Sequence, residues 1–113
     1  MRDLAGKART GLFIYFNNRS DSAMPTIRKI ELDVLKPHLP NVLEFAGGIA
    51  AIGPDYQVYL DVVEIDDKTE TLTLVIEGQA LDYSRIEEVI KSLGGSIHSI
   101  DKCLIVGEGV NQR

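Results

Sequence analysis

The sequence predicts a small α+β domain with the element order β-α-β-β-α-β. Two runs rich in β-branched residues meet at Asp66-Asp67-Lys68-Thr69 and predict a hairpin over residues 57–78. Apolar and charged residues alternate from Thr26, before the hairpin, and apolar residues at helical spacing follow it over residues 82–93. In about 85 residues this order is the split βαβ, ferredoxin-like arrangement: a four-stranded antiparallel sheet with both helices on one face.

The first strand is predicted to have one apolar face and one charged face. Its apolar positions are Ile30, Leu32 and Val34, and the alternating positions are Lys29, Glu31 and Asp33. Residues 36–40 contain two prolines and are expected to end the strand, because proline cannot donate a ladder hydrogen bond. Pro40 also suits the first turn of the helix that follows.

The first helix is predicted from Val42, Phe45, Ile49 and Ile52, which are spaced for one helical face. Gly47-Gly48 lies inside it and costs up to about 1 kcal/mol per glycine relative to alanine. We therefore expect packing, rather than intrinsic propensity, to hold this helix, and Gly53-Pro54 to end it.

The second helix has clearer signals at both ends. Asp82 is a good N-cap, and Leu81 can pack onto Ile86 as a hydrophobic staple. Its expected buried stripe is Ile86, Val89, Ile90 and Leu93, and Gly94-Gly95 is expected to end it. A last strand follows from Ser96 to about Val106, with a bulge predicted near His98-Ser99 because Ile97 and Ile100 are out of step for a period of two.

The open face of the predicted sheet is expected to be polar and acidic, carrying Lys29, Glu31, Asp33, Thr71, Thr73 and Glu77. In this topology the second and fourth strands are the edges of the sheet. Exposed edges and an uncovered face are typical of surfaces that bind another chain, so homo-oligomers are expected.

Three segments resemble a known family. ELDVLKPH (31–38), VVEIDDKTETLTLVIEG (62–78) and GGSIHSID (94–101) are similar to segments of a small archaeal family, domain-of-unknown-function family 211, over about residues 27–101. The resemblance implies a ferredoxin-like, cytoplasmic protein that forms homo-oligomers and has no assigned activity. This chain departs from the family pattern at Leu39 and Lys102, where acids are usual, and at Gly47-Gly48.

Length and charge indicate one domain, expected at residues 24–107, with a tail at 108–113. Residues 1–23 carry four basic and two acidic side chains, whereas residues 24–113 carry eight basic and fifteen acidic ones. The first segment is interpreted as an extension that is either flexible, or upstream of a true start at Met24, or paired through Leu12–Phe16 with a sheet edge or a neighbouring subunit. That apolar run is too short to cross a membrane.

The acidic balance makes nucleic acid a poor partner, since like charges repel the phosphate backbone. The lone Cys103 has no second cysteine for an internal disulfide, which fits a reducing compartment and predicts a cytoplasmic location. No segment predicts a membrane partner.

Two groups of residues are candidate metal ligands. Glu64, Asp66, Asp67 and Glu70 surround the hairpin turn, and oxygen ligands suit a hard cation such as calcium or magnesium. His38 and His98, with Asp33 and Asp101, are predicted to meet at one end of the sheet, where imidazole and carboxylate would suit zinc. A solvated charged turn and hydrogen-bonding histidines are the plainer alternatives.

The sequence contains no catalytic constellation: there is no nucleophile elbow around Ser84 or Ser99, and no CxxC at Cys103. The leading hypothesis is a non-enzymatic, oligomer-forming module that binds a divalent cation or small ligand between subunits. The alternative is a small-molecule-sensing regulatory domain of the amino-acid-binding type, with its effector held by residues 36–40. A metal-dependent enzyme is third. Beyond the divalent cation, no cofactor is predicted.

Overall fold

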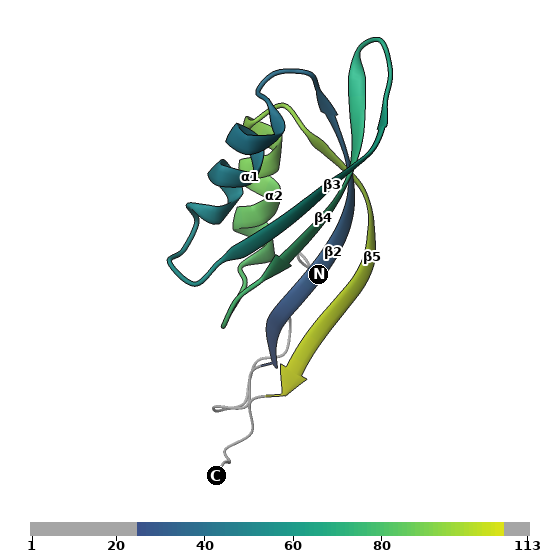
Figure 1. Ribbon diagram of the computed structural model, residues 1–113. Coiled ribbons are helices and arrows are strands. Elements are labelled where there is room, and N and C mark those ends of the chain that lie inside the picture. Colours follow the sequence, from purple (N-terminus) through teal and green to yellow (C-terminus); the bar gives the residue numbers. More distant parts are fainter. Residues whose placement is uncertain (1–24, 108–113) are drawn as a thin grey trace. The chain divides into compact units, whose positions relative to one another are not determined.

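The computed structural model describes residues 25–107, in which four strands and two helices follow the predicted order (Figure 1). The predictions for residues 1–23 and 108–113 lie outside the described residues. Ile27–Ile105 form one compact unit. The elements are β2 (Pro25–Pro37), α1 (Val42–Ala50), β3 (Gln57–Ile65), β4 (Thr69–Glu77), α2 (Tyr83–Ser92) and β5 (Ser96–Gly107).

The strands form one antiparallel sheet in the order β3-β4-β2-β5, and both helices cover the same face of it (Figure 1). This confirms the ferredoxin-like fold, with β3 and β5 as the edges. Neither described helix is long and apolar enough to cross a membrane.

The core lies between the sheet and the two helices. Ile30, Leu32 and Val34 of β2 stand opposite Ile76, Leu74 and Leu72 of β4, and all six are at most 3% exposed. Buried residues from the helices complete it, namely Phe45, Ile49, Ile86 and Ile90. Fully burying such a side chain contributes about 1.5–3 kcal/mol, so this layer holds α1 despite its two glycines.

The first helix starts and ends inside the predicted limits. Asn41 is its N-cap: the Asn41 side chain accepts from the Glu44 N–H, and the Glu44 side chain accepts from the Asn41 N–H. Pro40 precedes this N-cap and lies outside the helix, so the prediction that it occupies the first turn is wrong. The helix ends at Ala50, and Ile52 packs against the core from the following turn.

The second helix confirms its predicted signals. The Asp82 side chain accepts from the Arg85 N–H at 3.2 Å, and Leu81 and Ile86 are both buried. At the other end Gly94 has a φ of 90°, which a side chain would disfavour, and the Gly95 N–H bonds to the Ile90 carbonyl at 2.9 Å. This is the glycine-terminated C-cap expected from the sequence.

The face of the sheet opposite the helices carries the predicted polar residues, but it is less uniformly acidic than expected. Tyr59 and Leu35 lie on it by strand alternation and are 55% and 40% exposed. Ile97 packs against the core while Ile100 is 53% exposed. The bulge near His98-Ser99 stays a prediction. A register shift occurs in β3, between Val62 and Glu64.

Candidate functional site

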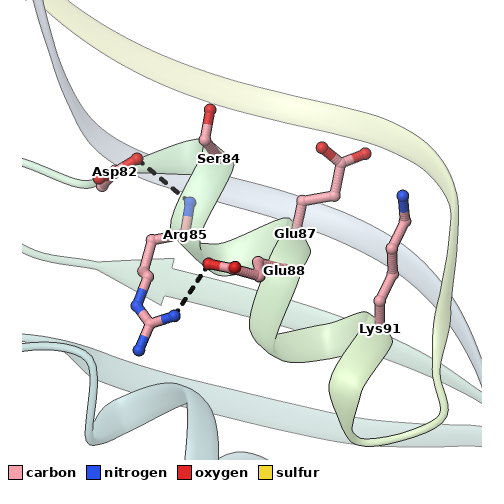
Figure 2. A pocket seen from close by; sticks show the side chains of 6 residues that line it. All are labelled: Asp82, Ser84, Arg85, Glu87, Glu88 and Lys91. Atoms are coloured by element: carbon pink, nitrogen blue, oxygen red, sulfur yellow. Dashed lines mark hydrogen bonds and ion pairs between the residues drawn. The ribbon is translucent and has the colours of Figure 1, made fainter.

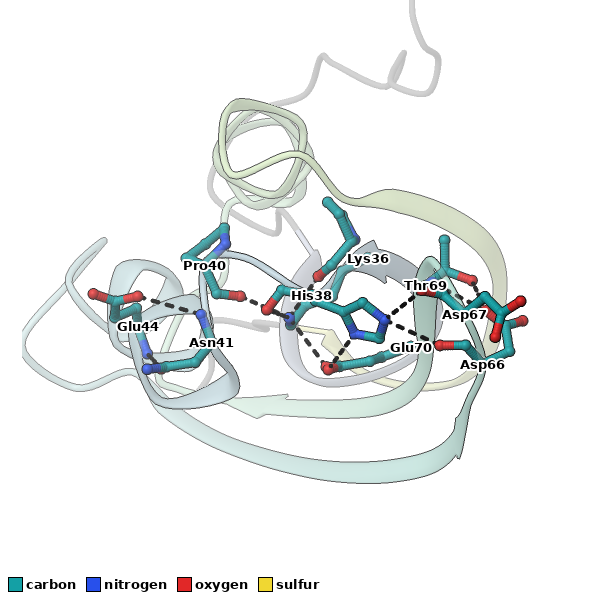
Figure 3. A network of polar contacts seen from close by, with 10 residues as sticks. Lys36, His38, Pro40, Asn41, Glu44, Asp66, Asp67, Thr69 and Glu70 are labelled. Atoms are coloured by element: carbon teal, nitrogen blue, oxygen red, sulfur yellow. Dashed lines mark hydrogen bonds and ion pairs between the residues drawn. The ribbon is translucent and has the colours of Figure 1, made fainter.

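A polar network joins the end of β2, the loop before α1 and the β3–β4 turn (Figure 3). Its centre is His38, whose Nδ1 lies 3.0 Å from Glu70 Oε2. The His38 Nε2 lies 3.0 and 3.1 Å from the carbonyl oxygens of Asp66 and Asp67. All three partners can only accept, so every contact is favourable only when both ring nitrogens carry a proton. The hydrogen bond to Glu70, and then the carbonyl contacts, raise the pKa of His38.

Glu70 lies between two basic side chains. Its Oε1 is 3.1 Å from Lys36 Nζ, in an ion pair whose angle is poor for a hydrogen bond. The hydrogen bond with His38, followed by the interaction with Lys36, lowers the pKa of Glu70. The carboxylate therefore stays charged and ties the hairpin to the loop before α1.

Lys36 is fully buried and its ammonium group has other acceptors nearby. Nζ donates to the carbonyl oxygens of Pro37 at 2.7 Å and Pro40 at 2.6 Å. It also lies 5.9 Å from the centre of the Phe45 ring, within the range of a cation–π contact. These contacts satisfy a charge that would otherwise be costly to bury.

The Lys36–Glu70 pair was not predicted from the sequence, although a signal for it is present. Lys36 comes two residues after buried Val34, and Glu70 comes two residues before buried Leu72, so both continue the core-facing period of two. In the sheet they stand directly opposite each other. Two opposite charges at the end of two core-facing patterns predict a buried pair.

The turn between β3 and β4 is organised by Asp66. Its Oδ1 accepts from the Lys68 N–H at 3.2 Å, the Thr69 N–H at 3.0 Å and the Thr69 hydroxyl at 3.0 Å. The bond from the Thr69 N–H, followed by the other two, lowers the pKa of Asp66. Asp66 thus acts as the acceptor that closes the turn, a common role for this residue type.

The second predicted histidine belongs to a separate contact. His98 Nδ1 lies 3.7 Å from Asp33 Oδ2 on the open face, whereas His38 lies with Glu70 on the side of the core-facing positions. Asp101 accepts from the Ser99 hydroxyl at 2.7 Å. The structure therefore brings His98 to Asp33 and His38 to Glu70, but does not gather the four residues predicted to meet at one end.

Across residues 25–107, no group of three or more His, Cys, Asp or Glu side chains is arranged to hold a metal ion. Of the predicted ligands, His38 and Glu70 are in contact, Asp66 offers His38 its carbonyl, and Glu64 lies exposed on the edge strand β3. The divalent cation stays a prediction from the sequence.

A shallow hollow of about 460 Å³ lies on the outer side of α2 (Figure 2). It is lined by charged and polar side chains, namely Asp82, Ser84, Arg85, Glu87, Glu88 and Lys91. Arg85 already bonds to Glu88 at 2.9 Å. Burial, followed by the charge of Glu87, raises the pKa of nearby Tyr83. These contacts are typical of a solvated helix surface.

The two edge strands expose large apolar side chains. On β3 these are Tyr59, Val62, Val63 and Ile65, and on β5 they are Ile100, Leu104 and Ile105, with exposed fractions between 42% and 64%. The free Cys103 is also exposed on β5. Leu39 and Leu43, before and in α1, are 78% and 80% exposed.

Comparisons with known proteins agree with this architecture. The model of the DUF211 family, whose description is "Uncharacterized ArCR", matches residues 28–113. A relative from Methanocaldococcus jannaschii, named "Uncharacterized protein MJ0319", is 46% identical over 79 residues. The match covers 70% of this chain and 81% of the relative. Neither description states an activity, a ligand or a partner.

Proposed function

The chain belongs to the DUF211 family, and we propose that it is a self-assembling module whose copies join through the edges of their sheets. The observation that carries the proposal is the exposure of at least three large apolar side chains on each edge strand. An edge strand also presents unpaired N–H and C=O groups, so pairing with a second copy satisfies the backbone and buries the apolar side chains together.

The edge strands are long and carry few of the lysine and proline residues that often keep a sheet monomeric. Edge strands that avoid pairing with another chain are usually short or carry lysine or proline. Here β3 has nine residues without a lysine, arginine or proline, and β5 has twelve residues with Lys102 as its one lysine. A bulge also protects edges, but the bulge of β3 contains Val63, which is apolar and 63% exposed.

The predicted divalent cation or small ligand fits this proposal at the contact between copies. Glu64 lies on an edge strand, and a second copy would bring further oxygen ligands to it. No contact of the described residues favours the ligand-sensing alternative, since Lys36, His38 and the carbonyl groups of Pro37 and Pro40 already bond within the chain.

Native mass spectrometry of the full chain at micromolar concentration tests the proposal. We expect a mass of more than one 12.5 kDa chain, and Val63→Lys should lower the number of chains because it places a charge in the edge. Leu43→Lys is the matched control, since it adds the same charge at a more exposed apolar position on α1 and should leave the mass unchanged. A wild-type protein that is a single chain throughout would overturn the proposal.

The same spectra read bound metal directly. A cation held between copies should appear only in the assembled species, and addition of EDTA should remove it and lower the number of chains. Assembly that is metal-free and unaffected by EDTA would leave self-association in place and remove the cation.

A further inference from the structure

We infer that the open face of the sheet binds a basic amphipathic helix of a partner protein, which lies over β4 between two lines of carboxylates. Both described helices cover the opposite face, which leaves this face uncovered within residues 25–107 (Figure 1). The inference goes beyond the proposed function, because it concerns the face of the sheet and not the pairing of its edges.

Two lines of carboxylates run along the open face. β2 contributes Glu31 and Asp33, and β3 contributes Asp61 and Glu64. Asp33 and Asp61 both stand opposite Thr73 of β4, which lies between two buried, core-facing residues and so points away from the core. Strands in a sheet lie about 4.8 Å apart, so the two lines are about 10 Å apart with β4 between them.

The residues between the two lines are uncharged. On β4 these are Thr71, Thr73 and Val75. Tyr59 stands opposite Val75 and is 55% exposed. Leu35 stands opposite Thr71 and is 40% exposed. The face therefore offers a partner apolar contacts that cross β4, with carboxylates on both sides of it.

The carboxylates are available to a partner. Within residues 25–107, Glu31, Asp61 and Glu64 make no ion pair. Asp33 Oδ2 lies 3.7 Å from Nδ1 of His98, whose side chain is 77% exposed. Like charges gathered on one surface repel one another, so a basic partner is favoured there.

The dimensions of the face match those of an α-helix. A helix with its side chains is about 10–12 Å wide, so residues on its two flanks reach both lines of carboxylates at once. Glu31 and Asp33 are two residues apart on β2, which is about 7 Å, and residues i and i+4 of a helix are about 6 Å apart along its axis. Lysine or arginine at i and i+4 on each flank of an apolar stripe therefore fits this face.

Other occupants fit less well. A second copy that presented the same face would bring like charges together, and nucleic acid or an anionic membrane surface would meet the same repulsion. Lys29 is on this face too, but its Nζ already lies 3.6 Å from Glu77 Oε2. The surface is suited to a basic protein partner.

Titration of the 15N-labelled full chain with a synthetic helical peptide tests the inference. The peptide carries lysine at i and i+4 on both flanks of a stripe of alanine and leucine, and its control has the same composition in scrambled order. We expect the amphipathic peptide to shift the amide signals of Tyr59, Thr73 and Val75 and to bind more tightly than the scrambled one. Added salt should weaken this binding, because it screens exposed charges.

Paired charge variants locate the contact. The double variant Glu31→Gln, Asp61→Asn removes one carboxylate from each line and should weaken peptide binding on the order of fivefold, since exposed ion pairs are individually weak. The matched control Glu87→Gln, Glu88→Gln removes the same charge from α2, on the other side of the sheet, and should change the affinity by less than about twofold. Circular dichroism melts check that both variants are folded.

The outcomes separate this inference from the proposed function. Equal losses in the two double variants, equal binding of the two peptides, or signal shifts confined to the helices would overturn it, as would no binding at about 1 mM peptide. Assembly of Glu31→Gln, Asp61→Asn beyond that of the wild type, in native mass spectrometry, would show that a second copy covers the face instead. A wild type that is a single chain overturns the proposed function and leaves the peptide result in place.

Discussion

At the scale of single residues, His38 is held where only its protonated form satisfies every neighbour. Glu70, Asp66 and Asp67 each present an oxygen to the ring, and none of these oxygens can donate. The charged ring therefore joins the hairpin to the loop before α1, and loss of one proton turns a hydrogen bond into a contact between two acceptors.

Stability should therefore depend on pH through His38. Its pKa in the folded protein is raised above the ordinary value of 6.5, so its contribution is fully present below about pH 6.5 and is lost as pH rises through the raised pKa. We expect the urea midpoint of the wild type to fall between about pH 6 and pH 9, and that of His38→Gln to change much less.

His98→Gln is the matched control for this prediction. Its side chain is 77% exposed and lies 3.7 Å from Asp33, so its loss should leave the pH dependence in place. An unchanged pH dependence in His38→Gln would contradict the assignment.

Lys36 should matter more for stability than an exposed lysine in the same sheet. Lys36→Met keeps the apolar stem but leaves Glu70 without its ion-pair partner and the carbonyl groups of Pro37 and Pro40 without the ammonium donor. We expect a loss of the order of 3 kcal/mol in the free energy of unfolding, measured by urea denaturation. Lys29→Met removes an exposed ion pair in which Lys29 Nζ lies 3.6 Å from Glu77 Oε2. This variant should change the free energy of unfolding by less than about 0.5 kcal/mol. Equal losses would contradict the role of the buried pair.

At the scale of elements, substitution by alanine should change stability in opposite directions at two glycines associated with the helices. A Cβ at Gly47, inside α1, would have no atom within 4 Å, whereas at Gly95, after α2, it would lie 2.9 Å from Phe45 Cζ. Gly47→Ala should raise stability by up to about 1 kcal/mol through helix propensity. Gly95→Ala should lower it, because Phe45 is buried and cannot move freely. Thermal melts at matched concentration check both, and a destabilised Gly47→Ala would contradict the analysis of α1.

Most elements could be predicted because their signals are local. The period of two in β2 and β4, the turn at Asp66 and the two ends of α2 are each encoded by neighbouring residues. The start of α1 was misplaced because Pro40 and Asn41 both suit a helix start, and only the reciprocal bonds of Asn41 and Glu44 decide between them. The network of His38 with Glu70 was hidden because its members are 32 positions apart in the chain.

At the scale of the whole molecule, the candidate site could be predicted only in part. The edges follow from topology, which the sequence pattern predicts. The exposed apolar side chains at Val63 and Ile105 look like ordinary strand residues until the structure places them on outermost strands. The sequence pattern at His98 and Asp101 suggested a shared site with His38, but sheet geometry puts the two histidines on different faces.

Sedimentation equilibrium of the full chain is the most direct test of self-assembly through the sheet edges. As the protein concentration is raised from about 1 to 100 µM, we expect the mean mass to rise above that of one 12.5 kDa chain. A mass of one chain at every concentration would contradict the claim.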